Sequence, residues 1–102
     1  MLGASAHRVP VVLDGFITGA AALIAVGLCP AAREYLIASH RSVEPGHQAV
    51  LAHLRLRPLL DLELRLGEGT GAVLAMGLAE AALRVLREMA TFESAGVTDA
   101  GA

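Results

Sequence analysis

The sequence predicts an α/β fold, because short apolar runs that favour strands alternate with longer segments that favour helices. Two runs, residues 9–13 and 35–38, are apolar throughout, as in strands that a parallel sheet buries on both faces. The first run leads directly into Phe16–Leu28, which is rich in alanine and predicts a buried helix. This order is typical of a Rossmann-like parallel sheet, in which ligands bind beyond the carboxyl ends of the strands.

Glycine and proline residues mark the ends of the other predicted elements. Residues 1–6 are rich in alanine and predict the last turns of a helix. Gly27 and Pro30 end the helix that begins at Phe16. Pro45 favours the first turn of a further helix, which we expect to reach about residue 54.

The second half of the chain predicts a strand, a glycine-rich break and a long helix. Residues 60–66 alternate leucines with charged residues, as in a half-exposed strand, although a short helical turn also produces this pattern. Residues 72–90 predict a long helix, with Met76 and Met89 in the core, and the small polar residues 94–102 are expected to fray. The predicted apolar face of this helix consists of Leu74, Leu78, Ala82, Val85, Leu86 and Met89.

The composition is that of the interior of a larger assembly. Apolar residues make up 55% of the 102 residues and charged residues 18%, whereas soluble domains have roughly 45–50% and ~25%. A small domain has much surface, so a membrane, an oligomer or further chain is expected to cover the excess. The net charge of −2 and the three aromatic residues argue against nucleic acid as a partner. The single cysteine, Cys29, excludes a disulfide framework and fits a reducing cytoplasm.

A membrane segment is the less favoured interpretation of the apolar run at residues 16–29. This run is shorter than the ~20 residues that a helix needs to cross a bilayer. An upstream extension would bring Arg8 and Asp14 to bilayer depth, where charges are costly. We therefore expect a buried strand–turn–helix unit and no membrane partner.

The glycine-rich segment GEGTG, at residues 67–71, is the sharpest local motif. It is neither a dinucleotide-binding fingerprint nor a P-loop, because the spacings differ and the P-loop lysine is missing. Glycines on both sides leave the Glu68 carboxylate open to a ligand, although a simple turn before a helix fits as well. Asp14 and Gly15 follow the first strand, and Asp14 is either a ligand-facing carboxylate or a cap for the next helix.

A second polar segment, residues 39–47, follows the second strand. A Ser/His/acid hydrolase and a metal site formed by His40, His47 and His53 are both weak interpretations. The usual nucleophile elbow is absent, and the six-residue spacing of the last two histidines does not place them on one helix face. A loop of caps and backbone-bonding side chains is the stronger interpretation. We expect no metal ligands here.

Four blocks occur in order along the chain: VPVVLDGF at residues 9–16, YLIASH with Ser42 and EPGH at residues 35–47, LRLGEGTG at residues 64–71, and MATFE at residues 89–93. Together they resemble the nicotinate-nucleotide:dimethylbenzimidazole phosphoribosyltransferase family, which activates the lower ligand of cobalamin. The resemblance covers about residues 6–97. Several separate blocks make it specific, where GEGTG alone would not.

The resemblance implies a function and a set of site residues. The family transfers phosphoribosyl from nicotinate mononucleotide to 5,6-dimethylbenzimidazole, giving α-ribazole 5′-phosphate, as a homodimer that needs no cofactor. The catalytic glutamate of its GEG motif corresponds to Glu68. The positions that contact substrates in the family correspond to Asp14, Gly15, Ser42, Arg65 and Leu66.

The resemblance also implies an incomplete chain. The family's phosphate-binding glycine loop, a lysine and a second active-site glutamate have no counterpart here, and the sequence contains no lysine. We therefore expect the C-terminal part of the family's parallel-sheet domain at residues 1–71, and at residues 72–102 a long helix and tail that belong to a small helical domain. Such a chain is expected to be inactive alone. A non-catalytic binding module and a small membrane-associated protein remain alternatives.

Overall fold

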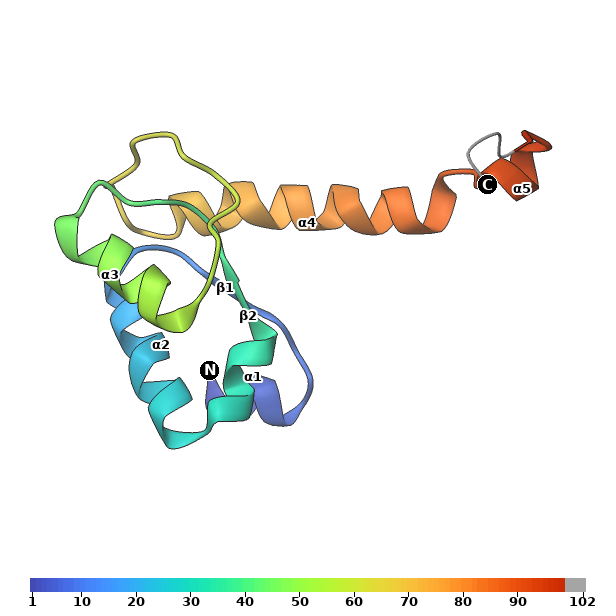
Figure 1. Cartoon of the computed structure of the whole chain (residues 1–102). Coiled ribbons are helices and arrows are strands. Elements are labelled where there is room, and N and C mark those ends of the chain that lie inside the picture. Colours follow the sequence, from blue (N-terminus) through green and yellow to red (C-terminus); the bar gives the residue numbers. More distant parts are fainter. Residues whose placement is uncertain (99–102) are drawn as a thin grey trace.

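The computed structural model describes residues 1–98, which form a small α/β body and one long helix that projects from it (Figure 1). The predicted fold class is confirmed. The elements, in chain order, are α1 (Leu2–Ala6), β1 (Val11–Leu13), α2 (Phe16–Leu28), the 3₁₀ helix η1 (Pro30–Tyr35), β2 (Leu36–Ala38), α3 (Pro45–Leu54), α4 (Thr70–Glu88) and α5 (Phe92–Ala95).

The two strands pair in parallel, as their apolar sequences predict. The register places Val11 opposite Leu36 and Leu13 opposite Ala38. The pairing continues for one residue beyond the strands, where the Ser39 amide donates to the Leu13 carbonyl at 3.0 Å. The polar residues that follow β1 and β2 therefore lie at the same edge of the sheet, which is the edge where a ligand site is expected.

The prediction of a strand at residues 60–66 is wrong, except at its first residue. Leu60 forms an isolated parallel bridge with His40, and the chain then runs as an irregular loop to Gly69. Glu63 adopts the left-handed conformation, with φ 57°, which is incompatible with a regular strand. The alternation of leucines with charged residues matches a strand, but the backbone takes another path.

The core lies between the sheet, α2 and α3, and small residues of α2 make it possible. Its buried cluster consists of Leu13, Ala22, Leu36, Val50 and Leu54. A Cβ added at Gly19 would lie 2.9 Å from Val50 Cγ1, so the absence of a side chain at Gly19 lets α2 approach α3. The turn η1 was not predicted, and its Arg33 donates to the carbonyls of Leu54 and Arg55 at the end of α3.

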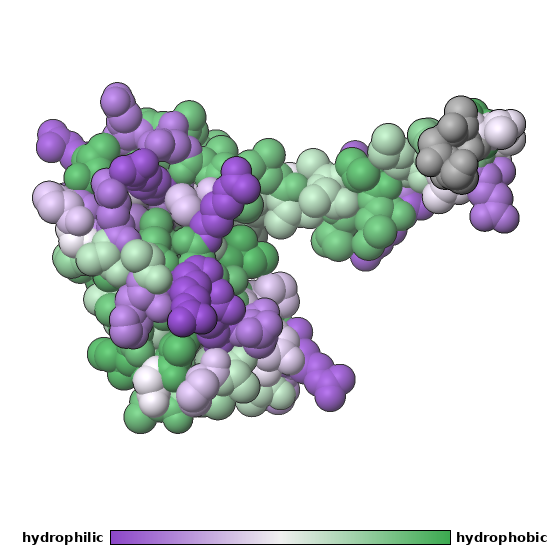
Figure 2. All heavy atoms as spheres, in the orientation of Figure 1, coloured by the Kyte–Doolittle hydropathy of each residue, from purple (hydrophilic) through white to green (hydrophobic). Residues whose placement is uncertain are grey.

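Helix α4 extends away from the body and exposes most of its apolar residues (Figures 1 and 2). Gly71 and Ala75, in its first two turns, are its buried residues. Met76 and Met89 are 56% and 69% exposed, so the prediction that they lie in the core is wrong in this chain. The predicted apolar face exists, but it faces solvent in the described residues 1–98. The outer face of α2 is exposed in the same way, so that its prediction as a buried helix is correct for one side.

The C-terminal segment is ordered further than predicted. Phe92–Ala95 form the short helix α5, and the Thr91 hydroxyl caps it by accepting from the Ser94 amide at 3.0 Å. The predicted fraying of residues 99–102 lies outside the described residues. Within residues 1–98, no helix is both long enough and apolar enough to cross a bilayer.

Candidate functional site

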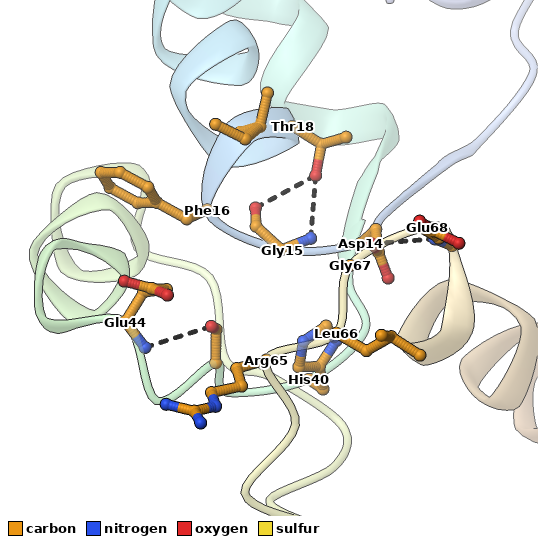
Figure 3. A pocket seen from close by; sticks show the side chains of 13 residues that line it. Asp14, Gly15, Phe16, Thr18, His40, Glu44, Arg65, Leu66, Gly67 and Glu68 are labelled. Atoms are coloured by element: carbon orange, nitrogen blue, oxygen red, sulfur yellow. Dashed lines mark hydrogen bonds between the residues drawn. The ribbon is translucent and has the colours of Figure 1, made fainter.

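A cavity of about 500 Å³ opens at the carboxyl edge of the sheet (Figure 3). Four segments line it: the turn after β1, the start of α2, the loop after β2, and the loop before α4. All six residues that the sequence singled out contribute to its wall, namely Asp14, Gly15, Ser42, Arg65, Leu66 and Glu68. They come from positions up to 54 residues apart in the chain, and the fold brings them to one place.

Asp14 joins the end of β1 to the start of α4. Its Oδ2 accepts a hydrogen bond from the Gly69 amide at 3.1 Å, and its Oδ1 accepts one from the Ala72 amide at 3.2 Å. Both amides belong to the first turn of α4, where backbone N–H groups lack helical partners. Asp14 is therefore a helix cap, but for α4 and not for α2, the next helix in the sequence. At α2 the Thr18 side chain bonds the Gly15 backbone instead.

Glu68 lies in a strained turn at the mouth of the cavity. Gly67, Glu68 and Gly69 all adopt positive φ, at 76°, 56° and 82°. Glycine accepts this conformation freely, whereas a residue with a side chain loses about 1–2 kcal/mol there. The Glu68 side chain is exposed and borders the cavity. Backbone strain of this kind persists where the surrounding structure enforces it, and it is common at functional sites.

His40 forms the buried wall behind this turn. The Ser39 hydroxyl donates to the Asp14 carbonyl at 2.8 Å and lies 2.9 Å from His40 Nδ1. Because a hydroxyl has one proton, the contact with the ring requires Nδ1 to donate. Ser39 is fully buried, so it is not available as the nucleophile of a hydrolase.

His47 lies beneath His40, with the ring centroids 6.1 Å apart and nearly parallel. Its Nε2 lies 3.1 Å from the His40 carbonyl, and its Nδ1 is buried without a partner among the described residues. Burial lowers the pKa of His47 below its usual value. Within residues 1–98 no three His, Cys, Asp or Glu side chains gather as metal ligands would.

The remaining predicted residues line other parts of the cavity. Ser42 is buried, and its hydroxyl accepts from the Glu44 amide at 3.2 Å, which is the backbone-bonding role that the loop interpretation predicted. Arg65 and Leu66 lie at the rim, with Leu66 71% exposed. Arg65 is the single cation among the described lining residues, beside three carboxylates.

Sequence reasoning did not include Phe16 in the site. Its ring lines the cavity and packs against Gly46, where an added Cβ would lie 2.7 Å from Phe16 Cε2. A signal was present, because an aromatic residue directly after the Asp-Gly turn of a buried strand lies at the ligand-binding edge of the sheet. The sequence placed His40 only in a possible hydrolase or metal site. In the structure His40 lines the cavity, and Gly71 packs on its ring.

The sequence profile of the family DBI_PRT, described as phosphoribosyltransferase, matches residues 1–97. The chain is 68% identical over 99 residues to the nicotinate-nucleotide–dimethylbenzimidazole phosphoribosyltransferase of Chloroflexus aurantiacus, and 69% identical over 99 residues to that of Chloroflexus aggregans. These matches cover 97% of this chain and 28% of the length of each relative.

Solved structures agree with the sequence matches. The crystal structure of the nicotinate-nucleotide–dimethylbenzimidazole phosphoribosyltransferase from Thermus thermophilus superimposes with a TM-score of 0.90 at 56% identity, over 95% of this chain and 29% of that one. A structure of CobT from the same organism gives a TM-score of 0.91 at 55% identity, over 96% and 29% of the two chains. The chain belongs to the DBI_PRT phosphoribosyltransferase family.

Proposed function

We propose that this chain forms the part of a nicotinate-nucleotide:dimethylbenzimidazole phosphoribosyltransferase that activates the benzimidazole. The observation that carries the proposal is the cavity in which Glu68 meets the five residues expected to contact substrates. The names of the relatives, at 62–69% identity, support the choice of substrates. Since the chain spans 28% of the length of these relatives, the activity is proposed for the complete catalytic unit.

In the proposed reaction Glu68 acts as a general base. It removes the proton from one ring nitrogen of 5,6-dimethylbenzimidazole while the other nitrogen attacks the anomeric carbon of nicotinate mononucleotide. The bond between that carbon and the pyridinium nitrogen breaks, and its electron pair leaves with nicotinate. Attack from the opposite face inverts the anomeric centre and gives α-ribazole 5′-phosphate. The leaving group is already cationic, so the step needs no acid, metal or cofactor.

The other lining residues suit the binding of the heterocycle. Phe16 and Leu66 offer apolar surface on two sides of the cavity, which a flat benzimidazole would bury favourably. Arg65 is the cation available to an anionic substrate. We also infer a cytoplasmic location and a homodimer for the complete enzyme, and a division of this chain into residues 1–71 and 72–102.

A chimera tests the proposed base. This chain would replace the matched segment of the Thermus thermophilus enzyme, since the two backbones superimpose closely. The chimera is expected to make α-ribazole 5′-phosphate, detected by chromatography, and Glu68→Gln is expected to lower kcat by about 10²–10⁴ with little change in either KM. Glu63→Gln, in the same loop but outside the cavity lining, is the matched control and is expected to be nearly neutral.

Two results would contradict the proposal. Near-full kcat in the Glu68→Gln chimera would show that another group is the base. A chimera that binds dimethylbenzimidazole but makes no product, with Glu68 in place, would favour a binding module.

A further inference from the structure

Both carboxylate oxygens of Asp14 accept hydrogen bonds from backbone amides in this structure. The family resemblance predicts that this residue contacts substrate. Each of its oxygens, however, already accepts an N–H from the first turn of α4, at 3.1 and 3.2 Å. We propose that Asp14 is a positioning residue, which holds the loop carrying Glu68 in the geometry that base catalysis requires. This inference rests on the proposed function of Glu68.

The first of these hydrogen bonds acts on the peptide group next to Glu68. The amide of Gly69 belongs to the peptide bond that follows Glu68, so a hydrogen bond to this amide fixes the plane of that bond. The second hydrogen bond, from the Ala72 amide to Asp14, fixes the following turn of α4. Asp14 therefore determines where the helix begins, and with it the direction in which the Glu68 side chain leaves the backbone.

The loop has few other attachments that could do this. The Val43 amide donates to the Leu64 carbonyl at 3.2 Å. From residue 65 to residue 68, no hydrogen bond to another segment is present in the described structure. The two glycines beside Glu68 both have positive φ and tolerate many alternative conformations. Without Asp14, no hydrogen bond from another segment would hold the turn around Glu68 in the described structure.

Asp14 is itself firmly attached to the sheet. The preceding residue, Leu13, pairs with Ala38 in the core and is 2% exposed. The Asp14 carbonyl accepts from the buried Ser39 hydroxyl at 2.8 Å. A continuous path of hydrogen bonds thus runs from the sheet through Asp14 to the peptide beside Glu68. A base tied to a rigid sheet keeps its position better than one carried by a free loop.

A double-mutant cycle in the Thermus thermophilus chimera tests this role. Asp14→Asn keeps the size of the side chain but replaces one acceptor oxygen with an NH₂ group, which cannot accept from the second amide. We expect kcat to fall about 10- to 100-fold with both KM values little changed, because the base is misplaced while the substrates still bind. The Asp14→Asn/Glu68→Gln double variant is expected to be no slower than Glu68→Gln alone.

Control variants separate positioning from other effects. Asp61→Asn also removes a carboxylate, but an exposed one, whose Oδ2 lies 3.8 Å from Arg41 Nη1. This variant is expected to leave kcat unchanged. Asp14→Ser retains one acceptor oxygen and repeats the cycle if the asparagine variant fails to fold. Amide NMR signals of Gly69 and Ala72 give a readout that does not depend on activity. Both are expected to shift in Asp14→Asn, and neither in Asp61→Asn.

Several results would overturn the inference. One is a higher KM with unchanged kcat in Asp14→Asn, which would make Asp14 a substrate contact. Another is a double variant whose loss is the product of the two single losses, because Asp14 would then act independently of Glu68. Unshifted amide signals would also reject it. If Glu68→Gln alone retained full activity, the proposed function would fail, whereas the NMR result would still test the contact itself.

Discussion

Gly71 lies directly against the imidazole ring of His40. A Cβ placed on Gly71 would overlap His40 Nδ1 and Cε1 and would lie 2.7 Å from Cγ, which is inside any permitted contact. His40 has no room to move, because it is buried and its Nδ1 lies 2.9 Å from the Ser39 hydroxyl. The third glycine of GEGTG is therefore required by packing, and it sets how closely α4 approaches the wall of the cavity.

Gly71→Ala is expected to destabilise the protein by about 1–3 kcal/mol, since the new methyl group must displace His40 or α4. It should also lower kcat in the chimera, because α4 begins at the loop that carries Glu68. Gly77→Ala is the matched control. It lies in the same helix, an added Cβ meets no atom within 4 Å, and alanine should stabilise the helix by about 0.5–1 kcal/mol. Melting temperatures of the two variants that change in the same direction would contradict this account.

Acid is expected to destabilise the protein through His47. Burial in the folded state lowers the pKa of this side chain below its ordinary value of 6.5. The unfolded chain therefore binds a proton more readily than the folded chain does. The contribution of His47 to the free energy of unfolding is therefore fully present above pH ~6.5, and it is lost as the pH falls below that value. Chemical denaturation of the chimera between pH 5 and pH 8 measures it.

Two variants identify the histidine responsible. His47→Gln does not titrate and should flatten this part of the pH profile. His53→Gln, at an exposed position of the same helix α3, should leave the profile unchanged. A profile that flattens for His53→Gln instead would show that another residue is responsible.

The isolated chain is expected to self-associate. The apolar residues of α4 are largely exposed, with Leu86 at 81%, and surfaces of this kind bind to one another in water. Light scattering with size-exclusion chromatography, together with binding of a hydrophobic dye, should detect this. Leu86→Glu combined with Met89→Glu should reduce both signals. Arg84→Glu combined with Arg87→Glu is the control, because it adds negative charge without removing comparable apolar surface, and it should reduce them less. A sharp monomer peak without dye binding would refute the prediction.

The isolated chain is also expected to make no α-ribazole 5′-phosphate. The Glu68 side chain is exposed, so that water competes with the substrates and positioning is poor. Incubation of the chain with nicotinate mononucleotide and dimethylbenzimidazole, followed by chromatography, provides the measurement, with the chimera as the positive control. Turnover at a rate comparable to that of the chimera would contradict the expectation.

The sequence predicted those elements whose signals are local. The apolar run before Asp14 and the alanines after Phe16 specify β1 and α2 without help from distant residues. The prediction of a strand at residues 60–66 was wrong for a physical reason. Alternation shows which side chains are apolar, but not whether a neighbouring strand is present to pair with this backbone. In the same way, the apolar period of α4 predicts a helix with one apolar face, and cannot say what covers that face.

The site was predicted in part for the same reason. The family resemblance pointed to Glu68 and to five more of the residues that line the cavity, but not to Phe16. The sequence left open whether Asp14 caps a helix or meets a ligand, and no local pattern pairs it with Gly69, which is 55 residues away. The contact between Gly71 and His40 is equally non-local, so only the folded structure explains the third glycine.

The separation between Asp14 and its two partners has a consequence for the order of folding. These hydrogen bonds close loops of 55 and 58 residues, more than half of the chain. Closing such loops is entropically unfavourable until nearer contacts have formed. The unit β1–α2–β2 has much shorter separations and should form first, with α4 docking on it late. The proposed base, Glu68, would then be aligned in the last step of folding, so that partly folded chains present an apolar surface but no aligned carboxylate.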